Sequence, residues 1–551
     1  MITITMAKHF LFSLCLLLFS TACLAHHSEL DRFNQCQLDS INALEPDRRV
    51  ESEAGLTETW NPNHPELQCA GVSLIRRTID PNGLHLPSYS PSPQLIFIIQ
   101  GKGVLGLAVP GCPETYEEPR SQSRQQQQLR DSHQKIRRFS KGDVIAIPPG
   151  IPYWTYNHGD EPLVAISLLD TSNTLNQLDS NPRVFYLGGN LPEAEFPETQ
   201  EKHQQRQSVP TGRRGGHQQE EESEEQKKGN SVLSGFSAEF LAHSLNTNKE
   251  TAEKLQSPHG KRGQIVKVKN GLDIISPELQ EEERSHSQRE EKEEEEEERE
   301  QRHHKHSEKE EEEEEDEPLI HEIIKKWKKK TEEKKRESHG RGEKKEQVEE
   351  REEEEEEEEI HGQHSKGGDN GLEETICSPK ILENIARPSR ADLYNPRAGR
   401  ISTVNSLTLP ILRNLRLSAE YVLLYRNGIY APHWNINANS LLYVIRGQGR
   451  VRIVNSQGNP VFDDKVRKGQ LVVVPQNFVV AQQAGNEEGL EYVVFKTNDR
   501  AAVSHVKQVF RATPGEVLAN AFGLRKREVA QIKYNGNRGP LVQPQSQSQS
   551  Q

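Results

Sequence analysis

The sequence predicts an all-β protein with two tandem jelly-roll β-barrel domains, each followed by a short helical extension. Three observations support this prediction: short apolar runs alternate with Pro and Gly turns, the pattern occurs twice, and a Glu-rich segment lies between the copies. With 551 residues, the chain is also too long for one ordinary core. We expect a first barrel domain over 36–278, a disordered linker over 279–370, a second barrel domain over 371–538 and a disordered tail over 539–551.

The strands of the first barrel are predicted from β-branched and aromatic runs that end at turn residues. The clearest runs are Leu95–Ile99, Val144–Ile147 and Val164–Leu169. Gly101 follows the first run and Pro148 follows the second, so both end where a tight turn is favoured. All three runs are expected to be strands.

Polar stretches interrupt the first domain, and short helices close it. Residues 116–135, rich in Gln, Arg and Ser, and residues 191–230 contain few apolar side chains, so we expect disordered loops there. Ser234–Leu245 and 249–256 are expected to be short helices at the end of the domain.

The second domain repeats the first. Leu95–Gly103 matches Leu441–Gly449, and Lys141–Pro148 matches Lys468–Pro475. This repeat fits two homologous barrels better than one large sandwich. Near the end of the second copy, residues 513–516, Thr-Pro-Gly-Glu, have the order of a capping box, which predicts a helix that the Thr caps.

The linker is predicted from runs of like charge. Glu293–Glu298, Glu310–Glu315 and Glu352–Glu359 contain no apolar residue, and such a segment cannot bury enough surface to offset its chain entropy. One apolar island, Leu319–Trp327, interrupts it at helical spacing and is followed by three Lys. It is either a basic amphipathic helix that docks on a membrane or partner, or a transient helix neutralised by flanking glutamates. We favour the transient helix.

The first 25 residues have the pattern of a secretory signal peptide that is cut between Ala25 and His26. Its apolar run is too short to span a membrane, and no other segment is long and apolar enough to do so. We therefore expect a soluble mature chain that passes through the oxidising secretory route, without stable membrane insertion.

Four cysteines are left once the signal peptide is removed: Cys36, Cys69, Cys112 and Cys377. Four cysteines allow three pairings, and their spacing does not choose among them. None lies in a CxxC motif or in a zinc-like cluster, so metal ligation by these cysteines is not expected.

Charge is distributed unevenly on the two sides of the Asn370–Gly371 bond. Residues 371–551 contain 23 Lys and Arg against 13 Asp and Glu, whereas residues 1–370 contain 47 against 71. A cut at this bond would therefore give an acidic and a basic chain. The bond should be flexible and accessible, because Gly accepts any backbone angle and Asn tolerates the left-handed region. The whole-chain net charge of −14 argues against nucleic acid as the main partner.

The barrels resemble the cupins, a class of double-sheet jelly rolls, but lack the residues with which cupin enzymes bind metal. One cupin motif places Gly, Pro, Gly, a ligand His and Asn at fixed spacing. In the first barrel its Gly142, Pro148, Gly150 and Asn157 fall in register, but Tyr153 stands at the His position. In the second barrel Gly469 and Pro475 match, whereas the later Gly, His and Asn positions hold Asn477, Val480 and Ala484.

The other cupin motif, which supplies two His and a Glu, is also lost. Counting back from Gly101 places Pro87, Tyr89 and Gln94 at the three ligand positions of the first barrel. Counting back from Gly447 places His433, Asn435 and Ser440 there in the second barrel. One imidazole cannot hold a divalent metal in a catalytic site, which usually takes three protein ligands. We therefore expect His433 to be a barrel histidine, and neither barrel to have a metal, a cofactor or a catalytic residue.

Nearly the whole mature chain resembles the 11S globulins, the legumin class of seed storage proteins. The resemblance rests on both barrels, the four cysteines, the acidic linker and the junction Asn370–Ser378. It implies a non-catalytic nitrogen reserve with disulfides Cys36–Cys69 and Cys112–Cys377. The second disulfide would join the acidic and basic chains after an asparaginyl endopeptidase cuts between Asn370 and Gly371.

The resemblance further implies homo-oligomers: trimers of the precursor and hexamers of the mature protein. It implies a route from the endoplasmic reticulum to the protein storage vacuoles of seeds, and such proteins are frequent food allergens. Abundant Gln, Asn and Arg, beside only two Met, suit a nitrogen reserve.

The sequence also allows three other functions. A metal-dependent bicupin oxidase or decarboxylase would contain bound manganese or another metal. A vicilin-type 7S globulin would share the fold, but vicilins generally lack the interchain disulfide and the Asn-Gly cut. A secreted sugar-binding cupin would need an open aromatic pocket, for which Tyr153 and Trp154 are candidates, although burial is their expected use.

Overall fold

The structure is a computed structural model, and most of both barrel domains is described in it. The described residues are 36, 38–117, 131–191, 195–196, 229–256, 262–272, 274, 377, 379–535 and 539–544. Several predictions lie outside these residues: the signal peptide with its cut between Ala25 and His26, the linker with Leu319–Trp327, and the Asn370–Gly371 bond.

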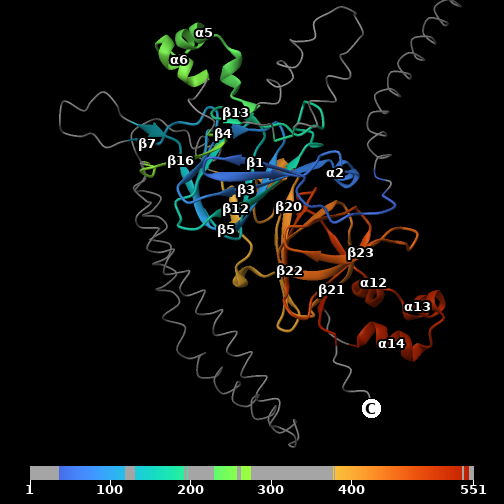
Figure 1. Cartoon of the computed structure of the whole chain (residues 1–551). Coiled ribbons are helices and arrows are strands. Elements are labelled where there is room, and N and C mark those ends of the chain that lie inside the picture. The colour runs from blue at the N-terminus through green and yellow to red at the C-terminus, as the bar shows by residue number, and fades with distance from the viewer. Residues whose placement is uncertain are drawn as a thin grey trace, which may run out of the picture. The chain divides into compact units, whose positions relative to one another are not determined.

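The first domain consists mainly of two antiparallel sheets (Figure 1). Seven strands make the first sheet, in the order β1 (Arg48–Ser52), β2 (Gly55–Thr59), β3 (Val72–Ile79), β12 (Leu163–Asp170), β5 (Gln94–Gln100), β10 (Asp143–Ile147) and β17 (Leu382–Asn384). The second sheet has the order β13 (Phe185–Tyr186), β4 (Gly83–Tyr89), β11 (Tyr153–Tyr156), β6 (Lys102–Leu107) and β9 (Ile136–Ser140), with β16 (Ile265–Lys267) paired to β4.

The second domain repeats this plan in strands that join into one sheet through the long strand β22 (Ser440–Val454). The main path is β18 (Leu393–Asn395), β19 (Gly399–Val404), β20 (Ser418–Leu424), β26 (Leu490–Lys496), β22, β25 (Val479–Ala484), β21 (Ile429–Asn435) and β27 (Val503–His505). Three more strands pair with this path: β23 (Pro460–Arg467) and β24 (Leu471–Val474) with β22, and β28 (Leu541–Val542) with β21. β28 lies in the tail that was predicted to be disordered, so that prediction is wrong for these two residues.

The predicted fold class of two barrel domains is confirmed, and so are the three strands predicted from apolar runs. These runs lie in β5, β10 and β12, which are neighbours in the first sheet. Leu95, Val144 and Leu168 are fully buried there. A strand that is buried along most of its length is apolar at successive positions, which is why these runs were readable in the sequence.

The two predicted loops are paired at their ends, so the loop prediction is wrong for those positions. The first loop begins in β7 (Tyr116–Glu117) and ends in β8 (Ser132–His133), which form a short antiparallel ladder. In the same way β14 (Asn190–Leu191) pairs with β15 (Gly229–Asn230) at the two ends of the second loop. Backbone pairing does not depend on apolar side chains, so the composition did not reveal these ladders.

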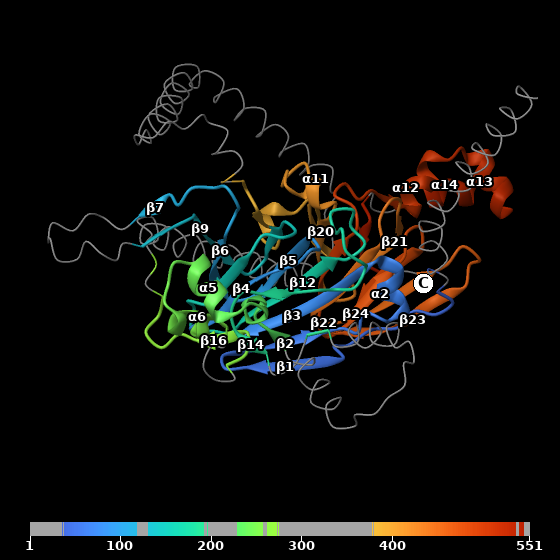
Figure 2. The same ribbon diagram turned by 90° about the horizontal axis from the view of Figure 1, so that it is seen from above.

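Both predicted helical regions are present, and each domain has a helical extension. In the first domain η1 (Val232–Gly235), α5 (Ala238–Ser244) and α6 (Lys249–Gln256) follow the barrel strands, and in the second domain α12 (Val506–Ala512), α13 (Gly515–Phe522) and α14 (Lys526–Tyr534) do so. α5 packs on α6, and α12 lies beside β21 (Figure 2). Two further short helices, α2 (Pro65–Ala70) and α11 (Leu412–Leu415), connect strands. None of the described helices is long and apolar enough to cross a membrane.

The predicted cap at Thr513 is wrong. Thr513 follows α12, and its hydroxyl donates a hydrogen bond to the carbonyl of Val509 at 2.8 Å. Pro514 is the N-cap of α13 and has no side-chain capping bond. The hydroxyl that completes one helix is thus not available to the next. In the first domain, by contrast, Ser237 caps α5 by accepting a hydrogen bond from the Phe240 N–H at 3.2 Å.

The N-terminal segment of each domain, 36–46 in the first and 377–388 in the second, is called its leading segment here. Each leading segment packs on the other domain. β17, which precedes the strands of the second domain, pairs with β10 at the edge of the first. Ile381, just before β17, is buried in the core of the first barrel. In return Leu44 exchanges two backbone hydrogen bonds with Leu471 of β24, at 2.8 and 2.9 Å. Each barrel is therefore completed by a segment that comes from the other half of the chain.

The two domains also share one hydrophobic core. Trp60 of the first domain is fully buried against Tyr443 of the second, with ring centroids 6.0 Å apart in an edge-to-face arrangement. The Arg76 guanidinium donates to the Tyr443 hydroxyl at 2.7 Å, which satisfies the polar end of that ring. Phe97 and Tyr421 stack across the same boundary. The domain boundary is thus packed like the interior of either barrel.

Candidate functional site

Strand pairing shows which residues of the first barrel stand where a cupin would bind metal. Tyr153 on β11 pairs with Ser88 on β4, and Val480 on β25 pairs with His433 on β21. Tyr153 and Val480 are the equivalent positions of the two repeats, so Ser88 is the residue that corresponds to His433. Both β4 and β21 carry a bulge beside this pair, which supports the same correspondence.

The positions Pro87 and Tyr89 obtained by counting back from Gly101 are therefore wrong by one residue. Gln94 lies six positions after Ser88, whereas Ser440 lies seven positions after His433. The turn into β5 is thus one residue shorter, and counting across it moves every position to the other face of the strand. Pro87 and Tyr89 are only partly buried, whereas Ser88 and Ser90 are buried.

Tyr153 fills the ligand position of the first barrel. Its side chain is buried, its hydroxyl donates to Gln94 Oε1 at 3.3 Å, and its ring stacks on His85 with centroids 5.7 Å apart. Burial, reinforced by the charge of Arg77, holds the pKa of His85 well below its ordinary value, so the imidazole is neutral. The burial of Tyr153 agrees with the use expected from the sequence, and Tyr153 does not line an open sugar pocket.

A buried ion pair anchors the second loop beside this site. Arg77 Nη2 lies 3.2 Å from Glu195 Oε1, and both side chains are buried. The Glu195 carbonyl also accepts a hydrogen bond from the Thr59 hydroxyl at 2.9 Å, and Phe196 packs against Ile75. The polar composition around Glu195 gave no sign that two residues of this stretch enter the core.

In the second barrel His433 is a buried, neutral histidine. Its Nδ1 lies 2.9 Å from the carbonyl oxygen of Ala431, which fixes Nδ1 as the protonated nitrogen. Its ring stacks on Tyr430 with centroids 3.8 Å apart. Burial, together with the charge of Lys496 and the nearby His505, lowers the pKa of His433 to about 3 against the effect of the Ala431 hydrogen bond.

Two charged residues that the sequence analysis missed lie beside His433. Lys496 Nζ and Glu420 Oε2 are 2.6 Å apart, with side chains only 5% and 6% exposed. Both are charged residues in mostly apolar strands, Glu420 within β20 and Lys496 at the end of β26, and those charges were the available signal. They line a cavity of about 20 Å³ together with His433, Asn435 and Ser440. Among the described residues, no three His, Cys, Asp or Glu side chains are grouped to hold a metal ion.

The structure contains the two disulfides that the family resemblance implies. Cys36 and Cys69 have Cα atoms 4.6 Å apart, and Cys112 and Cys377 have Cα atoms 5.4 Å apart. Cys377 is the described residue nearest to the predicted cut at Asn370 on its C-terminal side.

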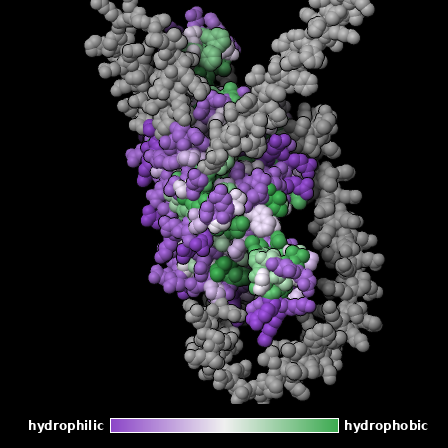
Figure 3. All heavy atoms as spheres, turned by 90° about the vertical axis from the view of Figure 1, so that its right-hand side faces the viewer, coloured by the Kyte–Doolittle hydropathy of each residue, from purple (hydrophilic) through white to green (hydrophobic). Residues whose placement is uncertain are grey.

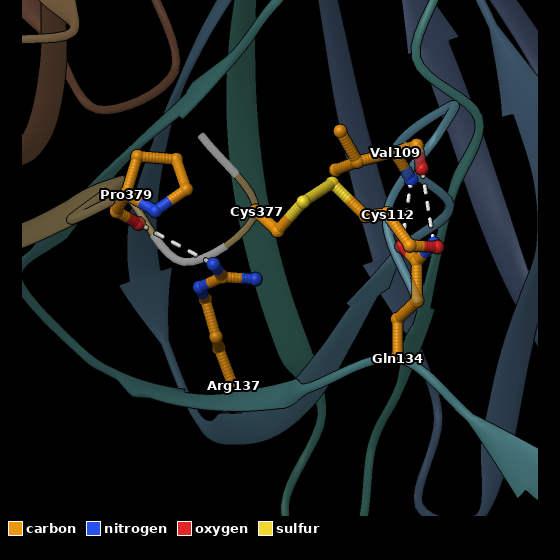
Figure 4. Close-up of a disulfide and its surroundings, with 6 residues drawn as sticks. All are labelled: Val109, Cys112, Gln134, Arg137, Cys377 and Pro379. Carbon is orange, nitrogen blue, oxygen red and sulfur yellow. Dashed lines mark hydrogen bonds between the residues drawn. A yellow bond between two sulfur atoms is a disulfide. The ribbon is translucent and has the colours of Figure 1, made fainter. Parts of the chain in front are cut away.

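Polar contacts hold both sides of the Cys112–Cys377 bond (Figure 4). The Gln134 side chain accepts from the Val109 N–H at 2.8 Å and donates to the carbonyls of Val109 and Cys112, both at 2.9 Å. On the other side, Arg137 Nη2 donates to the Pro379 carbonyl at 3.3 Å. The segment that follows Cys377 is thereby fixed to the first domain.

Two jelly-roll barrels, neither with a complete set of cupin metal ligands among the described residues, define a bicupin. A family model described as Cupin matches residues 41–193 and 383–530. Legumin type B of Vicia faba is 69% identical over 99% of this chain and 100% of its own length, and Legumin J of Pisum sativum is 71% identical over the same shares. The crystal structure of procruciferin, an 11S globulin from Brassica napus, is 33% identical, covers 93% of this chain and 99% of its own, and gives a TM-score of 0.67.

The chain belongs to the legumin-type 11S globulins of the cupin family. It is a seed storage globulin and not an enzyme.

Proposed function

We propose that this globulin is made as a precursor, cut between Asn370 and Gly371, and stored as a nitrogen reserve made of acidic and basic chains. The Cys112–Cys377 disulfide and the exchanged leading segments would hold the two chains together. The observation that carries the proposal is the attachment of the segment just after the cut to the domain before it.

That attachment has four parts. Cys377 is bonded to Cys112, and Arg137 holds the Pro379 carbonyl. Next along the chain, the Ile381 carbonyl accepts a hydrogen bond from the Ala146 N–H at 2.8 Å, and β17 then pairs with β10. A new chain end created at Gly371 would therefore start eleven residues before Leu382, the first residue of β17, a strand that is built into the other chain.

Assembly into rings is supported by apolar side chains on the two helical extensions. Phe236, Phe240 and Leu245 are exposed on or beside α5, and Val517, Phe522 and Ile532 are exposed on α13 and α14. In Figure 3 hydrophobic side chains appear on both extensions. Two different exposed apolar surfaces on one protomer favour head-to-tail contacts. Such contacts form a closed ring when the rotation that relates neighbouring protomers adds up to a full turn. We propose a trimeric ring for the precursor and a hexamer of two rings after the cut.

The route and the processing steps belong to the same proposal. The signal peptide would end at Ala25, so that the chain enters the endoplasmic reticulum with His26 as its first residue. An asparaginyl endopeptidase would cut after Asn370 in the protein storage vacuole of seeds. The domain limits of 36–278 and 371–538, and allergenicity, are part of this proposal as well.

Electrophoresis of protein isolated from seeds, with and without a reductant, tests the processing. We expect one disulfide-linked species that separates on reduction into a larger acidic chain and a smaller basic chain, and N-terminal sequencing should start the basic chain at Gly371. A single chain that stays intact under reduction would contradict the proposal. A Cys377→Ser variant is the matched control, because it should release the two chains in denaturant without any reductant.

No observation favours the alternative functions. A bicupin oxidase or decarboxylase would need ligands beyond His433 in the second barrel. A vicilin-type globulin would not be expected to have a disulfide such as Cys112–Cys377, which spans the predicted cut.

A further inference from the structure

The cavity of the second barrel is lined by polar atoms without a hydrogen-bond partner among the described residues. These atoms are the side-chain oxygens of Asn435, Ser440, Gln482 and Tyr492. All four side chains are at least 96% buried. Buried polar groups in native proteins nearly always have a partner, and an unpaired group costs free energy. Four such oxygens around one cavity indicate an occupant that pairs with them.

The size of the cavity restricts this occupant to about one non-hydrogen atom. The cavity measures about 20 Å³, and one enclosed water needs about 10–15 Å³ on the same kind of measure. A sugar, an organic acid or an aromatic ligand is therefore far too large.

The charges around the cavity exclude an ion. Lys496 and Glu420 neutralise each other across 2.6 Å, so no charge of either sign is left to balance an added one. A cation would be repelled by the ammonium group of Lys496, which already occupies the Glu420 carboxylate. An unpaired charge buried at such a site would be strongly unfavourable.

The hydrogen-bonding character of the four oxygens matches water. The amide oxygens of Asn435 and Gln482 only accept hydrogen bonds, whereas the hydroxyls of Ser440 and Tyr492 also donate. A water molecule donates two hydrogen bonds and accepts two, so it can satisfy all four groups. An ammonium ion donates four and accepts none, which would leave both hydroxyl protons unpaired.

We propose that the second barrel binds one ordered water molecule at its former metal site, hydrogen-bonded to Asn435, Ser440, Gln482 and Tyr492. This water is an integral part of the folded barrel. It pairs the polar groups that line the site and takes the place of a metal ion between them.

Tyr492→Phe tests this proposal by the sign of its effect on stability. If the hydroxyl bonds to water, its removal breaks a hydrogen bond and lowers the unfolding midpoint by roughly 2–4 °C. If the cavity is dry, the same change removes an unpaired buried group and raises the midpoint. The control is Tyr421→Phe, because the Tyr421 hydroxyl donates to Glu491 Oε1 at 2.9 Å and its loss should lower the midpoint in either case. Ser440→Ala should follow Tyr492→Phe in sign.

A high-resolution crystal structure and metal analysis of the full-length protein complete the test. We expect a single density peak about 2.5–3.0 Å from the four oxygens and no stoichiometric metal. A peak with contacts near 2.0–2.2 Å and an anomalous signal would identify a metal ion and overturn the proposal, as would a raised midpoint for Tyr492→Phe. Neither result bears on the cut at Asn370, which electrophoresis tests separately.

Discussion

The two barrels differ at one pair of equivalent positions on their inner faces. In the first barrel Tyr153 fills the space that a metal centre would need, and its hydroxyl is paired with Gln94. In the second barrel Val480 at the same position is too small to do so, and polar side chains surround a cavity of about 20 Å³. One fold has thus lost the same kind of site in two ways, by filling it with a ring and by leaving it polar. The residue that faces this position differs as well, because Ser88 of the first barrel corresponds to His433 of the second.

Among the changes that test this comparison, Lys496→Met should lower the unfolding free energy most, because it leaves Glu420 charged, buried and unpaired in the second barrel. We expect a loss of about 3–5 kcal/mol of unfolding free energy, measured by urea denaturation. The double variant Lys496→Met with Glu420→Gln should recover much of this loss. If the single variant were as stable as the parent protein, the buried ion pair would contribute nothing to the barrel.

Tyr153→Val should convert the first barrel into the type of the second. The change removes a buried ring and its hydrogen bond to Gln94, so we expect a loss of about 3 kcal/mol, again measured by urea denaturation. Tyr534→Val is the matched control, since Tyr534 is 69% exposed. Equal effects of the two changes would show that the ring does not support the barrel.

The pH dependence of stability should distinguish His433 from exposed histidines. An unfolded His binds a proton below about pH 6.5, whereas His433 in the folded barrel does so only near pH 3. Between these values the unfolded state binds more protons, so stability falls as the pH falls, by up to about 1.4 kcal/mol per pH unit. We expect His433→Gln to flatten the fall in urea midpoint between pH 7 and pH 5.

His243→Gln is the control for this measurement, because His243 is exposed on α5. Its midpoints should follow those of the parent protein at each pH. A His433→Gln variant that keeps the full slope would show that other groups cause the dependence.

Substitutions in the helical extensions should change the unfolding free energy least. Ser237→Ala removes the cap of α5 and should cost about 1 kcal/mol. Thr513→Ala should cost less than about 0.5 kcal/mol, because Thr513 does not cap α13. Measuring both losses of unfolding free energy in the same denaturation assay shows which of the two hydroxyls stabilises its helical extension more. A larger loss at Thr513 would mean that its bond to Val509 matters more than a cap.

The sequence predicted the features that depend on local pattern. The apolar runs of β5, β10 and β12 indicated strands because most of their residues are buried, and the repeat indicated two barrels. The predicted inner face of β4 was wrong by one residue. The turn before Gln94 is one residue shorter than in the second barrel, and counting back from Gly101 does not reveal this. The Glu420–Lys496 pair was missed, because the two residues lie 76 positions apart and only the pairing of β20 with β26 brings them together.

The exchange of leading segments was also missed, for a different reason. Residues 36–46 and 377–388 look alike in the sequence, and nothing in either segment tells which barrel it will join. Tertiary packing decided that question, and a local pattern carries no information about it.

The exchange has a consequence for synthesis. The edge of β10 is covered by β17, which leaves the ribosome only after the rest of the first domain and the whole linker. At typical rates of about 5–20 residues per second, this delay is on the order of 10–50 s. During that time the nascent first barrel presents an open strand edge, which invites pairing with a neighbouring nascent chain. The edge stays open to such pairing until the second half of the chain arrives and β17 closes it.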